Sequence, residues 1–238
     1  MNIAVILAGG CGKRTGQDIP KQFLNVEDKP IIIYTLEAFD KHPNIDGIIV
    51  SCVDGWDEIL WAYAREFNIK KLKWVVIGGN NVQESIEKAL DGLSGRCHGD
   101  DILLIHDAIR PMVSQDTISD CIVKCKEYGS GLAAVRCQET IVRTEDAIKG
   151  NHSIDRSEVM RVQTPQAYRY GRVRWALEEA KRRNIVDEVY INTLMIHVGE
   201  MVYFAMGSNK NIKITTAEDI EIFTALYNTK QESWVKSE

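Results

Sequence analysis

Short apolar runs alternate with amphipathic stretches along this chain of 238 residues. Six apolar runs, rich in Val, Ile, Leu and Ala, predict buried strands; they span residues 3–7, 47–52, 74–77, 102–105, 132–135 and 202–204. Six stretches with apolar residues at helical spacing predict helices; they span residues 31–39, 58–67, 82–93, 117–128, 173–183 and 218–227. Because strands and helices alternate, we predict an α/β fold with a doubly wound, mostly parallel sheet, which binds ligands at the carboxyl ends of its strands.

Residues 139–166 interrupt this alternation, because they are polar and irregular. Residues 140–143 and 160–163 are the two extended pieces of this stretch. We predict a β-arm that packs against a second subunit, since an extended arm buries little of itself alone; a surface loop is the alternative. No repeat, low-complexity tract or linker divides the chain, so residues 1–238 are predicted to form a single domain with 139–166 as its dimerisation arm.

The net charge of −5 argues against a protein that binds nucleic acid or a membrane surface, because both functions favour a basic face. No apolar run reaches the length of about eighteen residues that a membrane-spanning helix needs. The six cysteines form no Cys-x-x-Cys pair, and the apolar start of the chain predicts a strand instead of a signal peptide. We therefore expect a cytoplasmic protein in which basic residues act locally.

A glycine-rich turn after the first predicted strand is the first candidate for chemistry. Gly9, Gly10 and Gly12 allow backbone amides to converge on an anion, and Arg14 and Lys21 add positive charge. The turn is not a P-loop because Arg14 stands at the Ser/Thr position, and it lacks the spacing of a dinucleotide-binding turn. It predicts a polyphosphate site; a plain strand-to-helix turn with basic surface residues is the alternative.

Polar residues also follow the strand predicted at 102–105. Asp107 and Arg110 stand just past its carboxyl end, where doubly wound enzymes place groups that contact ligands. Asp107 is suited to bind Mg²⁺ or a substrate hydroxyl; the alternative is that it pairs with Arg110 and only orders the loop. His106 is flanked by apolar residues and is interpreted as a core histidine.

The segment 78–81, Gly-Gly-Asn-Asn, follows the strand at 74–77 and precedes a helix that contains Ser85. An amide side chain carries a donor and an acceptor together, as recognition of a pyrimidine edge requires. Gly79, Asn80 and Ser85 are therefore candidates for binding a base. An ordinary Gly/Asn turn is the alternative.

Near the end of the chain, Lys213 and Thr215 stand two residues apart in a segment predicted to be extended, and so share one side of it. A lysine and a hydroxyl in that arrangement are suited to hold one phosphate by charge and by hydrogen bond. Thr216 and Asp219 have the spacing of a capping box and are interpreted as structural. Lys213 is the functional candidate of this segment.

Six motifs occur in order along the chain: Ala-Gly-Gly-x-Gly-x-Arg, Pro-Lys-Gln-Phe, Gly-Gly-x-x-x-x-x-Ser, His-Asp-Ala-x-Arg-Pro, Gln-Thr-Pro-Gln and Asn-Ile-Lys-Ile-Thr. In this order they closely resemble the polyol-phosphate cytidylyltransferases, and the resemblance covers residues 2–227. The two best-known branches act on 2-C-methyl-D-erythritol 4-phosphate and on ribitol 5-phosphate. The resemblance implies a Rossmann-like nucleotidyltransferase fold, a homodimer joined by β-arms, dependence on Mg²⁺ or another divalent cation, and transfer of a cytidylyl group from CTP to a small polyol phosphate.

The resemblance also implies a role for each matching residue. The nucleotide would contact Ala8, Gly9, Gly10, Gly12, Gly79, Asn80 and Ser85, and its triphosphate would contact Arg14 and Lys21. The polyol phosphate would contact Asp107, Arg110, Thr140, Lys213 and Thr215, together with Arg156 from the arm of the second subunit. This assignment accounts for the irregular segment 139–166 as a dimerisation arm.

The implied reaction needs no nucleophilic side chain, because a phosphate oxygen of the polyol attacks the α-phosphorus of CTP and pyrophosphate leaves. Arg14, Lys21 and Lys213 are the predicted catalytic residues, since their charges would offset the negative charge that builds in the transition state. Asp107 is the candidate ligand for Mg²⁺.

Departures from the family pattern bear on which polyol phosphate accepts the cytidylyl group. Val82 stands where both branches usually carry arginine, Thr15 replaces a usual methionine, and Val186 stands where the methylerythritol branch tends to carry threonine. The context of Arg156 is closer to the methylerythritol branch. We favour an alditol phosphate such as ribitol 5-phosphate, for cell-surface polysaccharide synthesis. The alternatives are methylerythritol phosphate in isoprenoid synthesis, a nucleotide-binding relative without activity, and a nucleoside triphosphate hydrolase.

Overall fold

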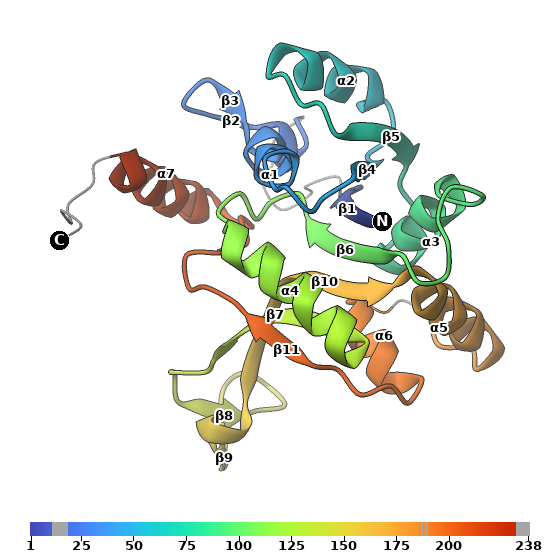
Figure 1. Cartoon of the computed structure of the whole chain (residues 1–238). Helices are drawn as coiled ribbons and strands as arrows, with labels where there is room; N and C mark the ends of the chain where they lie inside the picture. Colours follow the sequence, from blue (N-terminus) through green and yellow to red (C-terminus); the bar gives the residue numbers. More distant parts are fainter. Residues whose placement is uncertain (11–18, 187, 189, 232–238) are drawn as a thin grey trace, which may run out of the picture.

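A computed structural model describes residues 1–10, 19–186, 188 and 190–231 of the chain. Seven strands form its central sheet, in the order β11-β7-β10-β6-β1-β4-β5 (Figure 1). Their bounds are β1 Asn2–Ala8, β4 Gly47–Cys52, β5 Leu72–Ile77, β6 Ile102–Asp107, β7 Ser130–Arg136, β10 Met160–Arg169 and β11 Phe204–Met206. Two hairpins lie outside this sheet: β2 Asn25–Val26 with β3 Lys29–Pro30, and β8 Ile141–Arg143 with β9 His152–Ile154. Five of the six predicted strands are confirmed at their positions, and the sixth, predicted at 202–204, lies at Phe204–Met206.

One antiparallel strand makes this mostly parallel sheet mixed. The pairs β1–β4, β1–β6, β4–β5 and β7–β11 are parallel, whereas β10 runs antiparallel to both β6 and β7. Residues 160–163, predicted as an extended piece of the arm, are extended but belong to the main sheet, where Met160 pairs with Arg136. The sequence pattern hides β10 because several of its buried residues are polar, among them Gln163 and Gln166.

Helices cover both faces of the sheet (Figure 1). Their bounds are α1 Ile31–Asp40, α2 Asp57–Glu66, α3 Val82–Gly92, α4 Gln115–Tyr128, α5 Tyr170–Arg182, α6 Ile191–His197 and α7 Ala217–Gln231. One face packs against α1, α2 and α4, through side chains such as Leu36 and Ile118. The other packs against α3, α5 and α6, through side chains such as Ile86 and Leu194. The six predicted helices are confirmed, and α6 is additional, since its seven residues are too few to show a clear period.

Local side chains explain where two helices begin and end. Asn81 caps α3 by accepting a hydrogen bond from the Glu84 amide, and Ser114 caps α4 in the same way. Helix α4 ends at Tyr128 and is followed by Gly129, whose φ of 93° lies in the left-handed region that glycine adopts without strain. The N-terminus of α3 is thereby fixed close to the carboxyl end of β5.

Helix α7 joins the fold through a third apolar cluster, in which Phe223 packs with Tyr34 and Ile214. The Ile214 amide donates to the Ile109 carbonyl at 2.9 Å, so the segment before α7 lies beside the loop after β6. This contact brings Lys213 to Asp107. Among the described residues, no helix has the length and apolar character needed to cross a membrane.

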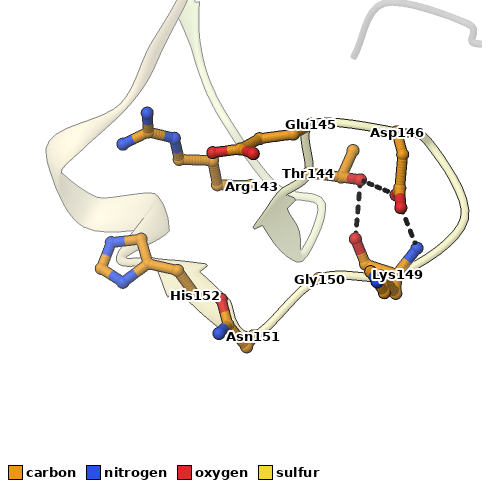
Figure 2. Close-up of a pocket in the computed structure, with 8 residues that line it drawn as sticks. All are labelled: Arg143, Thr144, Glu145, Asp146, Lys149, Gly150, Asn151 and His152. Atoms are coloured by element: carbon orange, nitrogen blue, oxygen red, sulfur yellow. Dashed lines mark hydrogen bonds between the residues drawn. The ribbon is translucent and has the colours of Figure 1, made fainter.

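The β8–β9 hairpin projects from the main sheet as an arm (Figure 1). Hydrogen bonds within its turn order it: the Thr144 hydroxyl lies 2.7 Å from the Lys149 carbonyl, and Asp146 Oδ1 accepts from the Lys149 amide (Figure 2). Asp146 Oδ1 also accepts from the Ile148 amide. A hollow of about 550 Å³ in this arm is lined only by residues of the hairpin and its turn, and they are exposed. The predicted ligand-binding motifs therefore lie elsewhere.

Candidate functional site

A cavity of about 420 Å³ lies at the carboxyl ends of β1, β5 and β6. The parallel register of β1 and β6 places Leu7 beside Asp107, so the turns that follow these strands meet at one edge of the sheet. The lining includes most predicted site residues: Ala8, Gly9, Gly10, Lys21, Gly79, Asn80, Ser85, Asp107, Lys213 and Thr215. The cavity thus occupies the position at which a doubly wound sheet binds its ligands.

Close packing shapes the glycine turn at the end of β1. A Cβ on Gly9 would lie 3.3 Å from the Ser85 hydroxyl oxygen, so the turn after β1 packs tightly on α3. Gln22 is buried and donates through Nε2 to the carbonyls of Ala8 at 2.7 Å and Gly10 at 3.1 Å. Gln22 stands in the Pro-Lys-Gln-Phe motif, but no role was predicted for it from the sequence. Its contacts show that it fixes the backbone of the turn.

Lys21, the residue before Gln22, brings a positive charge to the cavity. Lys21 begins the short 3-10 helix η1, Lys21–Phe23, and lines the cavity. Gly12 and Arg14, which the sequence places in the same polyphosphate site, lie outside the described residues. Their roles remain predictions.

The loop between β5 and α3 forms a second wall. The Gly79 amide donates to Ser85 Oγ at 3.0 Å, and the Ser85 hydroxyl donates to the Asn81 carbonyl at 2.8 Å. Glu84 Oε2 accepts from both the backbone amide and the side-chain amide of Asn80. A Cβ on Gly79 would lie only 2.2 Å from Glu84 Cβ, so a glycine is required there. This rigid loop lines the cavity where the base was predicted to bind.

Asp107 is the centre of a charged cluster on the opposite side of the cavity. Its Oδ2 accepts from Arg110 Nε at 3.0 Å, and its two oxygens lie 3.3 and 3.2 Å from Lys213 Nζ. Burial alone would raise the pKa of Asp107, but the charges of Lys213 and Arg110 outweigh burial and hold the pKa below its usual value. Asp107 is therefore a carboxylate with two cationic partners. The predicted pair with Arg110 is present, and Lys213 is a second partner that was not predicted.

Neutral groups beneath this cluster hold it in place. The Asp107 amide donates to Thr164 Oγ1 at 3.1 Å, so the single hydroxyl proton of Thr164 is left for Nδ1 of His106, 3.0 Å away. Nε2 of His106 then carries the ring proton and donates to the Arg110 carbonyl at 3.2 Å. Burial lowers the pKa of His106 to about 4, so the ring is neutral at pH 7. The interpretation of His106 as a core histidine is confirmed.

The segment before α7 contributes one residue to the charged cluster and two to the helix cap. The Thr215 and Thr216 hydroxyls donate to Asp219 Oδ2 at 2.8 and 3.0 Å, and the Asp219 amide donates back to Thr216. The capping box of Thr216 and Asp219 is confirmed, and Thr215 shares it while lining the cavity. Lys213 is the residue of this segment that contacts Asp107.

Two residues that were predicted to contact the polyol phosphate lie on or beside the arm. Thr140 is exposed just before β8, and Arg156 is exposed and donates through Nη1 to the Gln138 carbonyl at 3.1 Å. Neither lines the cavity of its own chain. A contribution from the arm of a second subunit therefore stays a prediction.

The residues at the cavity suit a metal ion that enters bound to the nucleotide, not one held by protein side chains alone. Among the described residues, no group of three His, Cys, Asp or Glu side chains is placed to hold a metal. Asp107, the predicted ligand, already contacts Arg110 and Lys213. Mg²⁺ commonly binds through substrate phosphates and water with one or two carboxylates. The donor set suits an ion carried by a nucleotide triphosphate, with Asp107 as the nearby carboxylate.

The cavity combines an excess of positive charge with a rigid polar wall. Lys21 and Lys213 line the cavity together with the carboxylate of Asp107, and Arg110 pairs with Asp107 without lining the cavity itself. The segment 79–85 presents backbone and amide groups. Such an arrangement suits a polyanion that carries a base. Tyr190 and Val82 also line the cavity. Tyr190 was not predicted from the sequence, because it stands alone before the short helix α6.

Comparison with known proteins gives a consistent assignment. The model of the 2-C-methyl-D-erythritol 4-phosphate cytidylyltransferase family matches residues 2–228. A ribitol-5-phosphate cytidylyltransferase of Lacticaseibacillus paracasei is 50% identical over 233 residues, which cover 97% of this chain and 100% of that protein. A 2-C-methyl-D-erythritol 4-phosphate cytidylyltransferase of Clostridium botulinum is 35% identical, covering 92% of this chain and 94% of that protein.

The fold is also shared with solved structures. A crystal structure of 4-diphosphocytidyl-2C-methyl-D-erythritol synthase superposes with a TM-score of 0.78 at 24% identity, covering 95% of this chain and 98% of that chain. The predicted Rossmann-like nucleotidyltransferase fold is confirmed. With the family model matching almost from end to end, the chain belongs to the polyol-phosphate cytidylyltransferase family, which includes the 2-C-methyl-D-erythritol 4-phosphate and ribitol-5-phosphate enzymes.

Proposed function

We propose that this enzyme transfers a cytidylyl group from CTP to ribitol 5-phosphate, giving CDP-ribitol and pyrophosphate. One structural observation carries the proposal: Lys21, the segment 79–85 and the Asp107–Lys213 pair line a single cavity. The 50% identity to a ribitol-5-phosphate enzyme supports this choice of acceptor. Val186 stands where the methylerythritol branch tends to carry threonine, which agrees with a different acceptor. The activated alditol would serve the synthesis of a cell-surface polysaccharide.

In the proposed reaction, a phosphate oxygen of ribitol 5-phosphate forms a bond to the α-phosphorus of CTP. The bond from that phosphorus to the oxygen bridging to the β-phosphorus breaks, and its electron pair leaves with pyrophosphate. Lys21 and Arg14 would stabilise the triphosphate, and Lys213 would place its ammonium between the acceptor phosphate and the α-phosphate. A divalent cation bound with CTP would add positive charge at the leaving group.

Asp107 and Arg110 would orient the acceptor instead of reacting with it. Arg110 is fixed by Asp107 and by the Asn211 carbonyl, to which its Nη1 donates at 2.7 Å. The Asp107 carboxylate accepts hydrogen bonds and so could also receive one from a polyol hydroxyl. The cluster would therefore select a ligand that carries both phosphate and hydroxyl groups.

We also infer a homodimer in which the arm of each subunit completes the cavity of the other. Arg156 and Thr140 lie outside the cavity of their own chain, and the arm exposes the apolar side chains Val142 and Ile148. Phe204 on the edge strand β11 is also exposed, by 43%. Sedimentation of the wild type against a Phe204→Asp variant tests this inference; a wild type that sediments as a monomer would contradict it.

The cytoplasm is the expected location of the reaction. Five cysteines of the described residues, Cys52, Cys97, Cys121, Cys125 and Cys137, are free thiols. Unpaired thiols are typical of a reducing compartment.

A second candidate acceptor is 2-C-methyl-D-erythritol 4-phosphate, which the family model and the 35% identical relative favour. Pyrophosphate release with CTP, Mg²⁺ and each of ribitol, methylerythritol, arabinitol, glycerol and mannitol phosphates separates the candidates. We expect the highest kcat/KM with ribitol 5-phosphate. Preference for methylerythritol phosphate would replace the proposed acceptor, and activity with none of them would reject the proposed reaction.

A further inference from the structure

Tyr190 stands at the acceptor end of the cavity. It directly precedes α6 and lines the cavity together with Asp107 and Lys213, while 44% of its surface remains exposed. Lys213 Nζ lies 5.3 Å from the centroid of its ring, within the range of a cation–π interaction. The Tyr190 ring therefore lies beside Lys213, the lysine that the proposed reaction requires, as Asp107 does.

The backbone that carries this ring is held by the core. Ile191 and Leu194 are buried against the sheet, and the Leu194 amide donates to the Tyr190 carbonyl at 3.2 Å. Gln166 Nε2 donates to Asn192 Oδ1 at 3.0 Å, so the Gln-Thr-Pro-Gln motif of β10 fastens the first turn of α6. Because the helix is anchored, Tyr190 can border the cavity without a large loss of backbone freedom when a ligand binds.

The two neighbours of Lys213 act on it differently. Asp107 neutralises the ammonium and competes with an incoming phosphate for it. The face of an aromatic ring attracts the same ammonium through its quadrupole but carries no net charge. A lysine held partly by a ring therefore keeps more of its attraction for an acceptor phosphate than one held by carboxylates alone.

We propose that Tyr190 is a positioning residue for the acceptor. Its ring holds the Lys213 ammonium toward the acceptor phosphate, and its open face contacts the C–H groups along the carbon chain of a linear polyol phosphate. This inference rests on the proposed function, because the ligand that Tyr190 serves is the acceptor of that reaction.

Binding measured without turnover tests the inference. The protein is saturated with a CTP analogue that has a methylene bridge between the α- and β-phosphorus atoms, and ribitol 5-phosphate is titrated by calorimetry. Tyr190→Leu should weaken ribitol 5-phosphate binding on the order of tenfold, whereas Tyr190→Phe, which keeps the ring, should stay within about twofold of the wild type. The affinity for the CTP analogue should not change in either variant.

A matched control is available at the end of α4. Tyr128 is 45% exposed and its ring lies 5.3 Å from the Lys124 ammonium, but it does not line the cavity. Tyr128→Leu should bind ribitol 5-phosphate like the wild type. Equal loss in the two leucine variants, unchanged binding in Tyr190→Leu, or absent binding in the wild type would overturn the inference. If binding follows the prediction but no polyol phosphate releases pyrophosphate from CTP, the proposed function fails while the role of Tyr190 in binding stands.

Discussion

Replacing Lys213 with methionine removes one ammonium from the acceptor end of the site and keeps an unbranched side chain of similar length. We expect the variant to fold, because the Asp107 carboxylate keeps its hydrogen bond from Arg110 Nε at 3.0 Å. The backbone amide of Asp107 also keeps its hydrogen bond to Thr164 Oγ1. The lysine side chain is 27% exposed, so its removal does not open the core. The main effect should fall on catalysis.

The expected magnitudes differ for rate and stability. Loss of one well-placed charge that stabilises a transition state typically lowers kcat by about 10²–10³, equivalent to about 2.7–4 kcal/mol. Exposed ion pairs contribute about 0.2–1 kcal/mol and broken buried pairs cost about 3–5 kcal/mol. The half-buried Lys213–Asp107 pair lies between them, so we expect about 1–2 kcal/mol, or about 3–6 °C in Tm for a chain of this size.

The pH dependence of stability gives an independent check. The pKa of Asp107 is lowered in the folded protein, so its contribution to stability is present above its unfolded pKa of about 3.9 and is lost as pH falls through the folded pKa. Without Lys213, one of the two cations that lower this pKa is removed, and the pKa therefore rises. Acid unfolding of Lys213→Met should begin at a higher pH than that of the wild type.

Pyrophosphate release with CTP and ribitol 5-phosphate measures kcat, and thermal unfolding between pH 3 and pH 7 measures stability. Lys210→Met is the matched control, because Lys210 is exposed and does not line the cavity; its kcat and unfolding curve should match those of the wild type. A kcat for Lys213→Met within fivefold of the wild type would refute the assigned role.

Three further predictions follow from the geometry of the site. Gly79→Ala should weaken CTP binding at least tenfold, because its Cβ would lie 2.2 Å from Glu84 Cβ. Gly99→Ala is the control: its Cβ would meet no atom within 4 Å, so this variant should bind CTP like the wild type in the same titration. Gln22→Leu should also weaken CTP binding on the order of tenfold, since the turn carbonyls of Ala8 and Gly10 lose their donor; unchanged affinity would contradict this role. The pKa of His106 is lowered to about 4 in the folded protein, so the unfolded chain binds the proton first as pH falls. The free energy of unfolding should therefore decrease between about pH 6.5 and pH 4, by up to about 3 kcal/mol. Denaturant titrations should show a smaller decrease in the His106→Gln variant.

Periodicity predicted the strands and helices whose buried residues are apolar, and it failed where buried residues are polar. Gln163 and Gln166 lie in the core of β10, where amide groups from distant segments satisfy them: Gln163 Nε2 donates to the Ser208 carbonyl at 2.8 Å, and Gln166 donates to Asn192. A sequence window contains neither partner. The pattern therefore placed residues 160–163 in the arm, although they belong to β10 and residues 160–162 pair with β7.

The same distinction between local and distant contacts divides the site. The glycine turn and the 78–85 segment were predicted because their function depends on backbone shape within a few residues. Tyr190 was missed because its contact with Lys213 arises only when α6 packs on the sheet. Gln22 stood inside a recognised motif, but the carbonyls it binds precede it by more than ten residues. Gly12, Arg14, Thr140 and Arg156 keep the roles that the family resemblance gives them, as predictions.

The two cations on Asp107 are not equivalent, and the difference assigns them separate roles. Arg110 contacts Asp107 at 3.0 Å and is also tied to the Asn211 carbonyl, so its planar group has a fixed place. Lys213 lies farther away, at 3.2 and 3.3 Å, on a flexible stem beside an aromatic ring. When an acceptor phosphate arrives, Lys213 can turn toward it while Arg110 keeps the carboxylate paired. Asp107 would then stabilise the empty site through both cations and release only the one that the reaction uses, which is why Lys213→Met should lower kcat far more than it lowers stability.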